Sequence, residues 1–558
     1  MAFNDVLESI GGVGCFQISQ VIFLVIPVCL IACHNFLQNF TAAIPDYHCK
    51  PSIQGNRTFL SNITAKEGIL LKAFIPMDQN QKPEKCLQFS TIQWHLLNPN
   101  TTIIENVTEM HTQPCIGGWV YDTTVFESTI VSEWDLVCDL QVLRDVAQSI
   151  YMAGVLAGAI VFGALSDRFG RRIPLISSYL QIAITGTSTA FLPSFSSYCV
   201  FRFMAGMTFS GIVLNSFSLI LEWTPTKGRI VAGACLGYFV TFGQIILAGV
   251  AYKIRNWRWL QLAVSVPFFI AFLCSWKLSE SPRWLLLHNK SHVAVRNLKK
   301  VAAINGKKKE GDKITQQVLN SHMQTETTKL KSSHTVFDLF RTPALRRVTC
   351  CLMVIWFSSS FSYYGLAMDV QKFGMNIYIV QMMFGALDLP AVLLSTFTMI
   401  FVGRRITLAG FFTIGGLMVL INRFVPEELQ TLRTAQAALG KGCLASSFIG
   451  AYQYSGELYP TEIRQTGMGF VSTQARIGAM IAPLVYMLRD SFPILPSLIF
   501  GAAPLLAGVV TCFLTETRCS PLLETIAEME QRARKVQPLK EEEISLQQQA
   551  TGHLKESV

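Results

Sequence analysis

Stretches of mostly apolar residues, each about long enough to cross a lipid bilayer, recur along the whole chain. A helix needs about 20 such residues to span the hydrocarbon core of a membrane. Only 15% of the 558 residues are charged, against about 25% in soluble proteins. We therefore predict an all-α polytopic membrane protein whose twelve transmembrane helices are Phe16–Phe36, Val146–Leu165, Ile173–Leu192, Tyr198–Leu221, Ile230–Tyr252, Trp259–Leu278, Val348–Ala367, Ile377–Phe401, Ile406–Ile421, Leu432–Ser455, Gln465–Leu488 and Phe492–Leu514.

The long polar segment between the first two spans, residues 37–143, indicates the extracellular side. It carries glycosylation sequons at Asn39, Asn56, Asn62, Asn100 and Asn106 and the cysteines Cys49, Cys86, Cys115 and Cys138. Clustered sequons and an even cysteine count are typical of an oxidising, extracellular compartment. Four cysteines allow three pairings, among which the sequence does not choose. The alternative is a cytosolic loop with reduced thiols. Asn39 is the sequon closest to the membrane and the least accessible.

Most of the net charge of +10 lies in one loop. Residues 280–347 hold 14 Lys and Arg against 5 Asp and Glu, which predicts a cytoplasmic loop and disfavours nucleic-acid binding. Twelve spans then place both termini in the cytoplasm, although Lys253, Arg255 and Arg258 fall in an outside loop. The N-terminus lacks the basic region of a cleavable signal peptide. The expected divisions are 1–15 (N-terminus), 16–278 (first six-helix half), 279–347 (basic loop), 348–514 (second half) and 515–558 (tail).

Three pairs of motifs repeat at nearly one offset. Gly170 and Gly403, each followed by two arginines, are 233 residues apart, and Glu222–Arg229 matches Glu457–Arg464 at 235. Glu280 and Glu516 form a weaker match near 236. The repeat predicts two six-helix halves with a substrate site between them near the membrane midplane.

At these residues the chain resembles the major facilitator superfamily, whose signature is D-R-F-G-R-R (167–172). The segments Ala32–Pro45, Phe384–Ala391 and Gly456–Gly469, together with the large loop, are similar to the organic ion transporter family and most of all to its organic anion branch. The resemblance implies the major facilitator fold. It also implies gating or coupling residues, which are Asp167, Arg168, Arg171, Glu222, Arg229, Asp388, Lys441, Glu457 and Arg464.

Four ionisable residues lie well inside predicted spans: Arg202, Asp388, Lys441 and Arg476. A guanidinium at the centre of a membrane helix costs at least about 2.5–3.5 kcal/mol, so a functional role is the first hypothesis. In similar anion transporters an arginine at the position of Arg476 binds the substrate anion, and cation-transporting relatives carry an aspartate there. Asp388 is interpreted either as a coupling carboxylate or as a structural partner of an arginine or of a break at Pro390. Arg202 and Lys441 have structural pairing as their alternative.

The apolar part of the site is expected to be aromatic. The resemblance at helices one, seven and ten favours Asn35, Trp356, Phe361, Tyr363, Tyr364, Phe448 and Tyr452 as substrate-binding residues. Tyr238 of helix five and Ser472 are expected in the same set, beside Arg476. Aromatic clusters in membrane helices also serve as packing or interface anchors. Similar dicarboxylate exchangers have a lysine where this chain has Val392, and a tyrosine at Val240. With one cation fewer, we expect bulky monoanions to be preferred over dianions.

We therefore predict a plasma-membrane secondary transporter of amphipathic organic anions, such as prostaglandins or steroid sulfates, that works by alternating access, with a counter-anion as an exchange partner. An organic cation or zwitterion transporter that reads its substrate with Asp388 is the alternative, and a receptor or channel is disfavoured by the complete repeat. The chain has no phosphate loop, no nucleophile motif and no metal-spaced histidines, so no enzyme, cofactor or metal is expected. The C-terminal Glu556–Val558 is a weak match to scaffold-binding tails.

Overall fold

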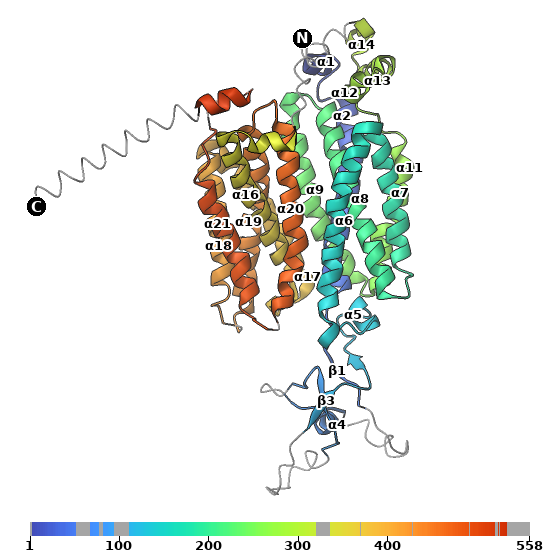
Figure 1. Cartoon of the computed structure of the whole chain (residues 1–558). Coiled ribbons are helices and arrows are strands. Elements are labelled where there is room, and N and C mark those ends of the chain that lie inside the picture. Colours follow the sequence, from blue (N-terminus) through green and yellow to red (C-terminus); the bar gives the residue numbers. More distant parts are fainter. Residues whose placement is uncertain are drawn as a thin grey trace, which may run out of the picture.

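The computed structural model describes residues 3–51, 67–77, 82–93, 111–317, 319, 335–368, 370–426, 428–489, 491–518, 523 and 525–532. Its long helices form two groups that stand side by side (Figure 1). The first half comprises α2 (Cys15–Phe36), α6 (Val142–Phe169), α7 (Arg172–Thr189), α8 (Phe195–Trp223), α9 (Thr226–Lys253), α10 (Trp257–Ser265) and α11 (Pro267–Ser275). The second half comprises α16 (Pro343–Ala367), α17 (Ile377–Phe401), α18 (Arg404–Ile421), α19 (Gln430–Leu458), α20 (Arg464–Val485) and α21 (Leu495–Thr511).

These helices lie on the twelve predicted spans, with α10 and α11 sharing the sixth, and they confirm an all-α polytopic fold. Eight spans are long and apolar enough to cross a membrane by length and composition alone. The helices α7, α19 and α20 fall outside those eight, and α21 is shorter. The polar residues of α19 and α20 include Lys441 and Arg476, so two of the least apolar spans carry the charges of interest. A break at Pro390 was one expectation, but α17 continues through that residue.

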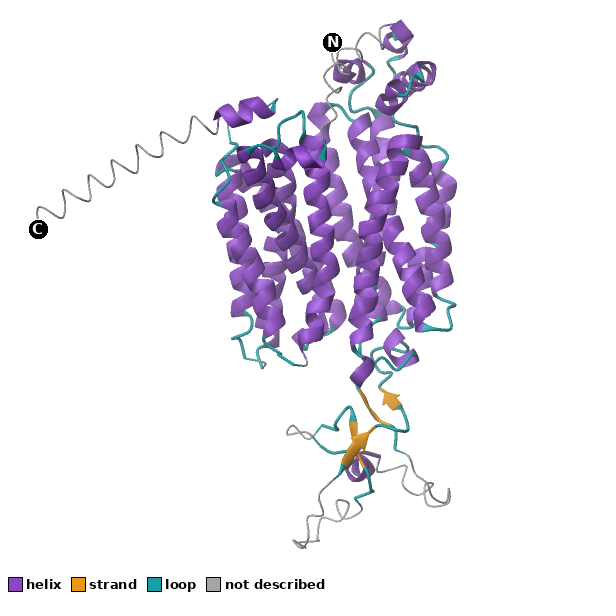
Figure 2. Cartoon of the chain, in the orientation of Figure 1, coloured by secondary structure: helices purple, strands orange, loops and turns teal. Residues whose placement is uncertain are grey.

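The two ends of the bundle differ. At the end that we call the terminus end lie α1 (Phe3–Ser9), α12 (Pro282–Leu287), α13 (Ser291–Ile304) and α14 (Lys308–Asp312) (Figure 1). At the opposite end, which we call the loop end, the segment between α2 and α6 extends away from the helices (Figure 2). Short 3-10 helices complete the described part: η4 (Cys138–Leu140), η5 (Val336–Phe340), η6 (Val370–Phe373) and η7 (Tyr486–Arg489).

The loop segment has a small β structure that the sequence did not predict. Strand β1 (Tyr47–Cys49) pairs antiparallel with β4 (Trp119–Tyr121), and β2 (Leu87–Phe89) pairs with β3 (Thr112–Pro114). The helices α4 (Glu67–Phe74) and α5 (Ile130–Glu133) flank them. Disulfides join Cys49 to Cys115 and Cys86 to Cys138, which selects one of the three pairings left open. The sequons at Asn56, Asn62, Asn100 and Asn106 and the tail Glu556–Val558 lie outside the described residues.

Basic residues at the loop end have local partners. The Arg258 guanidinium pairs with the Glu133 carboxylate, and Arg255 Nη1 donates to the Thr124 carbonyl at 3.0 Å. These contacts attach the loop segment to the first half and give Arg255 and Arg258 local partners.

The motif repeat corresponds to one turn that is built twice at the terminus end. The Glu280 carboxylate accepts from the backbone N–H groups of Arg171 (2.9 Å) and Arg172 (3.1 Å). Glu516 does the same for Arg404 (2.9 Å) and Arg405 (3.0 Å). The preceding glycines have φ of +93° and +119°, and a Cβ at either would lie within 2.8 Å of the carboxylate. Glycine is therefore required in both halves.

Candidate functional site

The two halves are joined by hydrogen bonds in the middle and at the loop end of the bundle. Asn35 Nδ2 of α2 donates to the Tyr364 hydroxyl of α16 at 3.2 Å. Gln244 Nε2 of α9 donates to the Tyr363 hydroxyl at 3.3 Å. Nearer the loop end, Asn39 Nδ2 donates to the Ala367 carbonyl at 2.8 Å. Buried apolar side chains of both halves share one core around these bonds, so the halves are closed against each other here.

Toward the terminus end a partly exposed aromatic ring stands between the two halves. The Tyr452 ring of α19 lies 5.8 Å from the Phe217 ring of the first half and 5.9 Å from the Trp356 ring of the second, centroid to centroid. Although it touches both halves, Tyr452 is 43% exposed, and Phe448 one turn away is 37% exposed. Both rings are therefore partly exposed on the terminus-end side of the closed contacts.

Arg476 lies in the middle of α20 and is half-buried. Its Nη1 donates to the carbonyl (3.0 Å) and the hydroxyl (3.1 Å) of Ser472 one turn earlier. Among the described residues no carboxylate pairs with Arg476, and neither Nε nor Nη2 has a hydrogen-bond partner. Tyr364 is close enough to interact electrostatically with it. The guanidinium is thus oriented by its own helix and keeps donors available for an anion.

Lys441 has a different environment. Its Nζ lies 2.6 Å from Asp388 Oδ2, and the two side chains are 0% and 3% exposed. The same Nζ donates to Gln244 Oε1 and to the Phe384 carbonyl, each at 3.3 Å. Three acceptors use all three ammonium donors. Asp388 therefore partners a lysine, not an arginine or a broken backbone, and the pair contributes no net charge.

Arg202 is enclosed within the first half. It is 1% exposed, its Nη2 donates to Gln38 Oε1 (2.9 Å) and Gln148 Oε1 (3.1 Å), and its guanidinium lies 4.5 Å from the Tyr151 ring centroid. These partners come from α3 (Gln38–Thr41) and α6 of the same half, so the contacts indicate the structural alternative for this arginine.

The predicted aromatic residues Trp356 and Phe361 are buried, in contrast to the partly exposed rings of Phe448 and Tyr452. Trp356 is 2% exposed and packs behind Phe448 at 5.6 Å between centroids, while its indole N–H donates to Ser455 Oγ at 2.9 Å. Phe361 is 3% exposed and packs on Phe500 of α21 at 4.9 Å. Phe361 therefore lies in the core behind these rings, and its expected contact with substrate stays a prediction. Tyr238 is half-buried on α9.

Several residues of this region were missed by the sequence reasoning. Gln244 and Gln381 lie 1% exposed inside apolar spans and bridge the two halves. A glutamine within an apolar run was an available signal, because a buried amide needs hydrogen-bond partners. Val392 lies one turn after Asp388 and is half-buried, so it shares a face of α17 with the ion pair.

Apart from the mid-bundle pair of Asp388 and Lys441, the predicted gating residues whose side chains are described cluster at the terminus end within their own halves. Arg171 lies 3.0 Å from Asp167 and 3.5 Å from Glu222. In the second half Glu457 pairs with Arg404 at 3.0 Å, a partner that the sequence reasoning did not name. The Arg168 guanidinium stacks on the Phe169 ring, and the Arg464 side chain donates to the Tyr459 carbonyl. The side chain of Arg229 lies outside the part of the chain that the structure describes.

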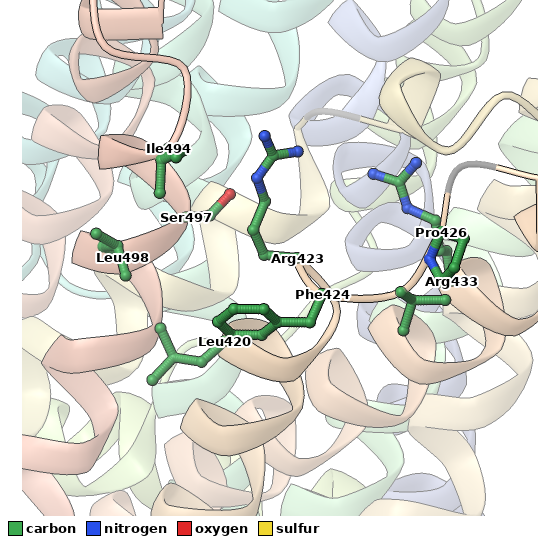
Figure 3. Close-up of a pocket in the computed structure, with 9 residues that line it drawn as sticks. Leu420, Arg423, Phe424, Pro426, Arg433, Ile494, Ser497 and Leu498 are labelled. Atoms are coloured by element: carbon green, nitrogen blue, oxygen red, sulfur yellow. The ribbon is translucent and has the colours of Figure 1, made fainter.

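A separate cavity of about 440 Å³ opens at the loop end of the second half (Figure 3). Figure 3 shows Arg423 above the apolar side chains of Phe424 and Leu420. The other lining residues are Val425, Pro426, Arg433, Ile494, Ser497 and Leu498. None of the predicted site residues lines it, so this cavity is not the candidate site around Arg476.

Comparison with known proteins identifies the family to which the chain belongs. The model of the family "Sugar (and other) transporter" matches residues 101–529. Solute carrier family 22 member 20 of Mus musculus is 57% identical over the full length of both chains. The chain belongs to solute carrier family 22. Member 6 of Danio rerio is 50% identical over 95% of each chain, and the prediction of the organic ion transporter family and its organic anion branch is confirmed.

Solved structures agree on the fold of this solute carrier family 22 protein. The inward open xylose transporter XylE from E. coli superposes with a TM-score of 0.56 at 17% identity, over 72% of this chain and 91% of that one. XylE bound to 6-bromo-6-deoxy-D-glucose gives 0.55 at 15% identity over 92% and 99%. With the family model and the relatives, the chain is a multi-pass membrane transporter and not an enzyme, and its fold is that of the major facilitator superfamily.

Proposed function

We propose that this solute carrier family 22 protein transports amphipathic organic anions by alternating access, with Arg476 binding the anionic end of the substrate. One observation carries the proposal. Arg476 stands in the middle of α20 without a carboxylate partner among the described residues, whereas Lys441 is paired with Asp388 at 2.6 Å. An unpaired guanidinium offers fixed, paired donors that suit carboxylate, sulfate or phosphate.

The apolar end of the substrate lies against the exposed rings of Tyr452 and Phe448, with Trp356 packed behind them. Ring faces bind by stacking and area burial, which tolerate different substrate shapes. One cation combined with such a surface suits large monoanions, such as prostaglandins or steroid sulfates, and gives broad selectivity.

Small dicarboxylates are disfavoured on the same grounds. Position 392 is valine, and Lys441 is already neutralised, so a second carboxylate of the substrate has no free cation among the described residues of this face. Loss of a lysine contact at 4 Å and an effective dielectric near 20 is worth up to about 4 kcal/mol. The alternative of a cation carrier is weakened as well, because Asp388 is engaged by Lys441.

The proposal includes an orientation. With its sequons and disulfides, the loop end faces the outside of the cell. The terminus end, where α12 and the basic helix α13 lie, faces the cytoplasm in the plasma membrane, and both chain termini are expected on that side. The state described here, closed at the loop end and accessible from the terminus end, is then the one that releases or loads substrate on the cytoplasmic side. A second anion that binds Arg476 in that state would drive exchange.

Uptake in expressing cells tests the substrate class. Labelled estrone sulfate, a prostaglandin, urate, glutarate and a small organic cation are offered separately, with the protein quantified at the cell surface. We expect uptake of estrone sulfate or the prostaglandin above glutarate. Uptake of the cation alone, at normal surface expression, would refute the anion proposal.

A further inference from the structure

Asn39 heads a glycosylation sequon, yet the structure places it inside the bundle. The helix of the first span continues as α3 (Gln38–Thr41), four residues into the predicted loop. The Asn39 side chain is 6% exposed. Its Nδ2, the atom that would carry a glycan, donates to the Ala367 carbonyl at 2.8 Å and to Gln381 Oε1 at 3.0 Å. We infer that Asn39 is a latch of the loop-end gate and not a glycan acceptor.

Both acceptors of the Asn39 amide belong to the other half. Ala367 is the last residue of α16, so its carbonyl has no partner within that helix. The Asn39 amide therefore supplies the missing donor from across the interface. Gln381 of α17 is 1% exposed and equally needs a partner. Separation of the halves at this end breaks both bonds at once.

Neighbouring residues extend the latch on both sides of Asn39. The Ile44 backbone N–H donates to Gln371 Oε1 at 2.9 Å, and Gln371 Nε2 donates back to the Ile44 carbonyl at 3.1 Å. One turn before Asn39, Asn35 donates to the Tyr364 hydroxyl beside Arg476. One short segment of the first half thus holds the second half at three positions, and the innermost adjoins the substrate site.

The room beside Asn39 excludes a sugar. The cavity that it lines with Gln38, Arg144, Gln371 and Tyr486 has a volume of about 30 Å³, enough for one or two water molecules. A glycan on Nδ2 would remove a donor and hold the halves apart. Glycosylation at Asn39 and closure of the loop end are therefore mutually exclusive.

Glycan counting tests the modification without any transport measurement. Asn56, Asn62, Asn100, Asn106 and Asn289, the other asparagines in N-x-S/T sequons, are all changed to Gln, and Asn39 is left in place. We expect peptide-N-glycosidase to leave the electrophoretic mobility of this variant unchanged while shifting that of the wild type. A shift in the variant would show a glycan on Asn39 and overturn this half of the inference.

Thiol labelling tests the latch, which rests on the proposed alternating access. A reporter, Val370→Cys, is placed in the closed gate, where Val370 is 1% exposed, and is labelled from outside with a membrane-impermeant reagent. Asn39→Ala should raise the labelling rate about tenfold, equivalent to about 1.4 kcal/mol. Chains without the reporter correct for the native cysteines.

Two matched variants separate the latch from the sequon and from general loosening. Thr41→Ala destroys the sequon but keeps the Asn39 amide, so it should leave labelling unchanged; a glycan-based role would make it behave like Asn39→Ala. Asn215→Ala removes a buried amide that bonds only within the first half and should also have no effect. If Asn39→Ala is not expressed, Gln371→Ala removes the adjacent pair of bonds. Unchanged labelling in surface-expressed Asn39→Ala or Gln371→Ala refutes the latch, even if anion uptake is confirmed.

Discussion

Lys441 and Asp388 neutralise each other inside the second half, with Nζ 2.6 Å from Oδ2 and almost no exposure of either side chain. Because this pair removes one cation and one anion from the middle of the bundle, Arg476 is the mid-bundle charge that remains accessible there within the described residues. Removal of one partner leaves a buried, uncompensated charge, which costs about 3–5 kcal/mol.

We therefore expect Lys441→Met or Asp388→Asn alone to lower thermal stability in detergent and surface expression strongly. The double variant, which leaves no charge, should recover most of both. Fluorescence-detected size-exclusion chromatography after heating measures the thermal stability of each variant without a transport assay. Equal losses in the single variants and the double variant would show that the pair is not coupled as the structure indicates.

Val392→Lys should add a cation one turn from Asp388 on α17. We expect a gain in glutarate uptake and in trans-stimulation by internal glutarate, because the second carboxylate of the substrate finds a partner. Val392→Met, similar in length but uncharged, is the control. No gain with the lysine variant at normal surface expression would contradict the charge-count explanation of monoanion preference.

Tyr452→Ala should affect large substrates more than small ones. Loss of an exposed ring removes apolar contact area worth about 25 cal/mol per Å², so KM for a steroid sulfate should rise severalfold while KM for urate changes little. Phe424→Ala, which truncates an exposed ring in the separate loop-end cavity, is the matched control. A uniform change for both substrates would place Tyr452 outside the site.

The hydrogen bonds to the Glu516 carboxylate predict that the stability of the protein depends on pH. Partial burial works to raise its pKa, but four backbone N–H donors, from Arg404, Arg405, Thr517 and Arg518, hold the pKa of this carboxyl below the ordinary 4.5. A carboxyl with a lowered folded-state pKa contributes stability that is complete above the unfolded pKa and is lost as pH falls through the folded value. The melting temperature should therefore decrease as the pH is lowered below about 4.5. The variant Glu516→Gln should show a smaller decrease over the same pH range.

Local patterns in the sequence were enough for the spans, the two-fold repeat and the mid-helix position of Arg476. Apolar runs and glycine-arginine turns depend on residues close together in the chain, so they were predicted correctly. The interaction partners of individual residues were not predicted, because these partners lie in distant segments of the chain. The pairing of Asp388 with Lys441, the placement of Phe361 behind the site and the disulfide connectivity each needed the packed halves.

Asn39 illustrates the same limit. Its sequon is a local pattern, but whether its amide faces solvent depends on how α3 meets Ala367 and Gln381 of the other half. Gln244 and Gln371 show the reverse case, since polar side chains within or beside apolar helices could have been recognised as contacts between the halves.

The charge of Arg476 is the most direct test of the account. Uptake of labelled estrone sulfate is measured for Arg476→Lys and Arg476→Asp, with Arg423→Asp as a control for an equal charge change in the separate cavity, and with surface protein quantified for each. We predict that Arg476→Asp abolishes uptake, that Arg476→Lys retains a reduced fraction because a point charge replaces the paired donors, and that Arg423→Asp transports normally. Undiminished uptake by surface-expressed Arg476→Asp would contradict the central claim.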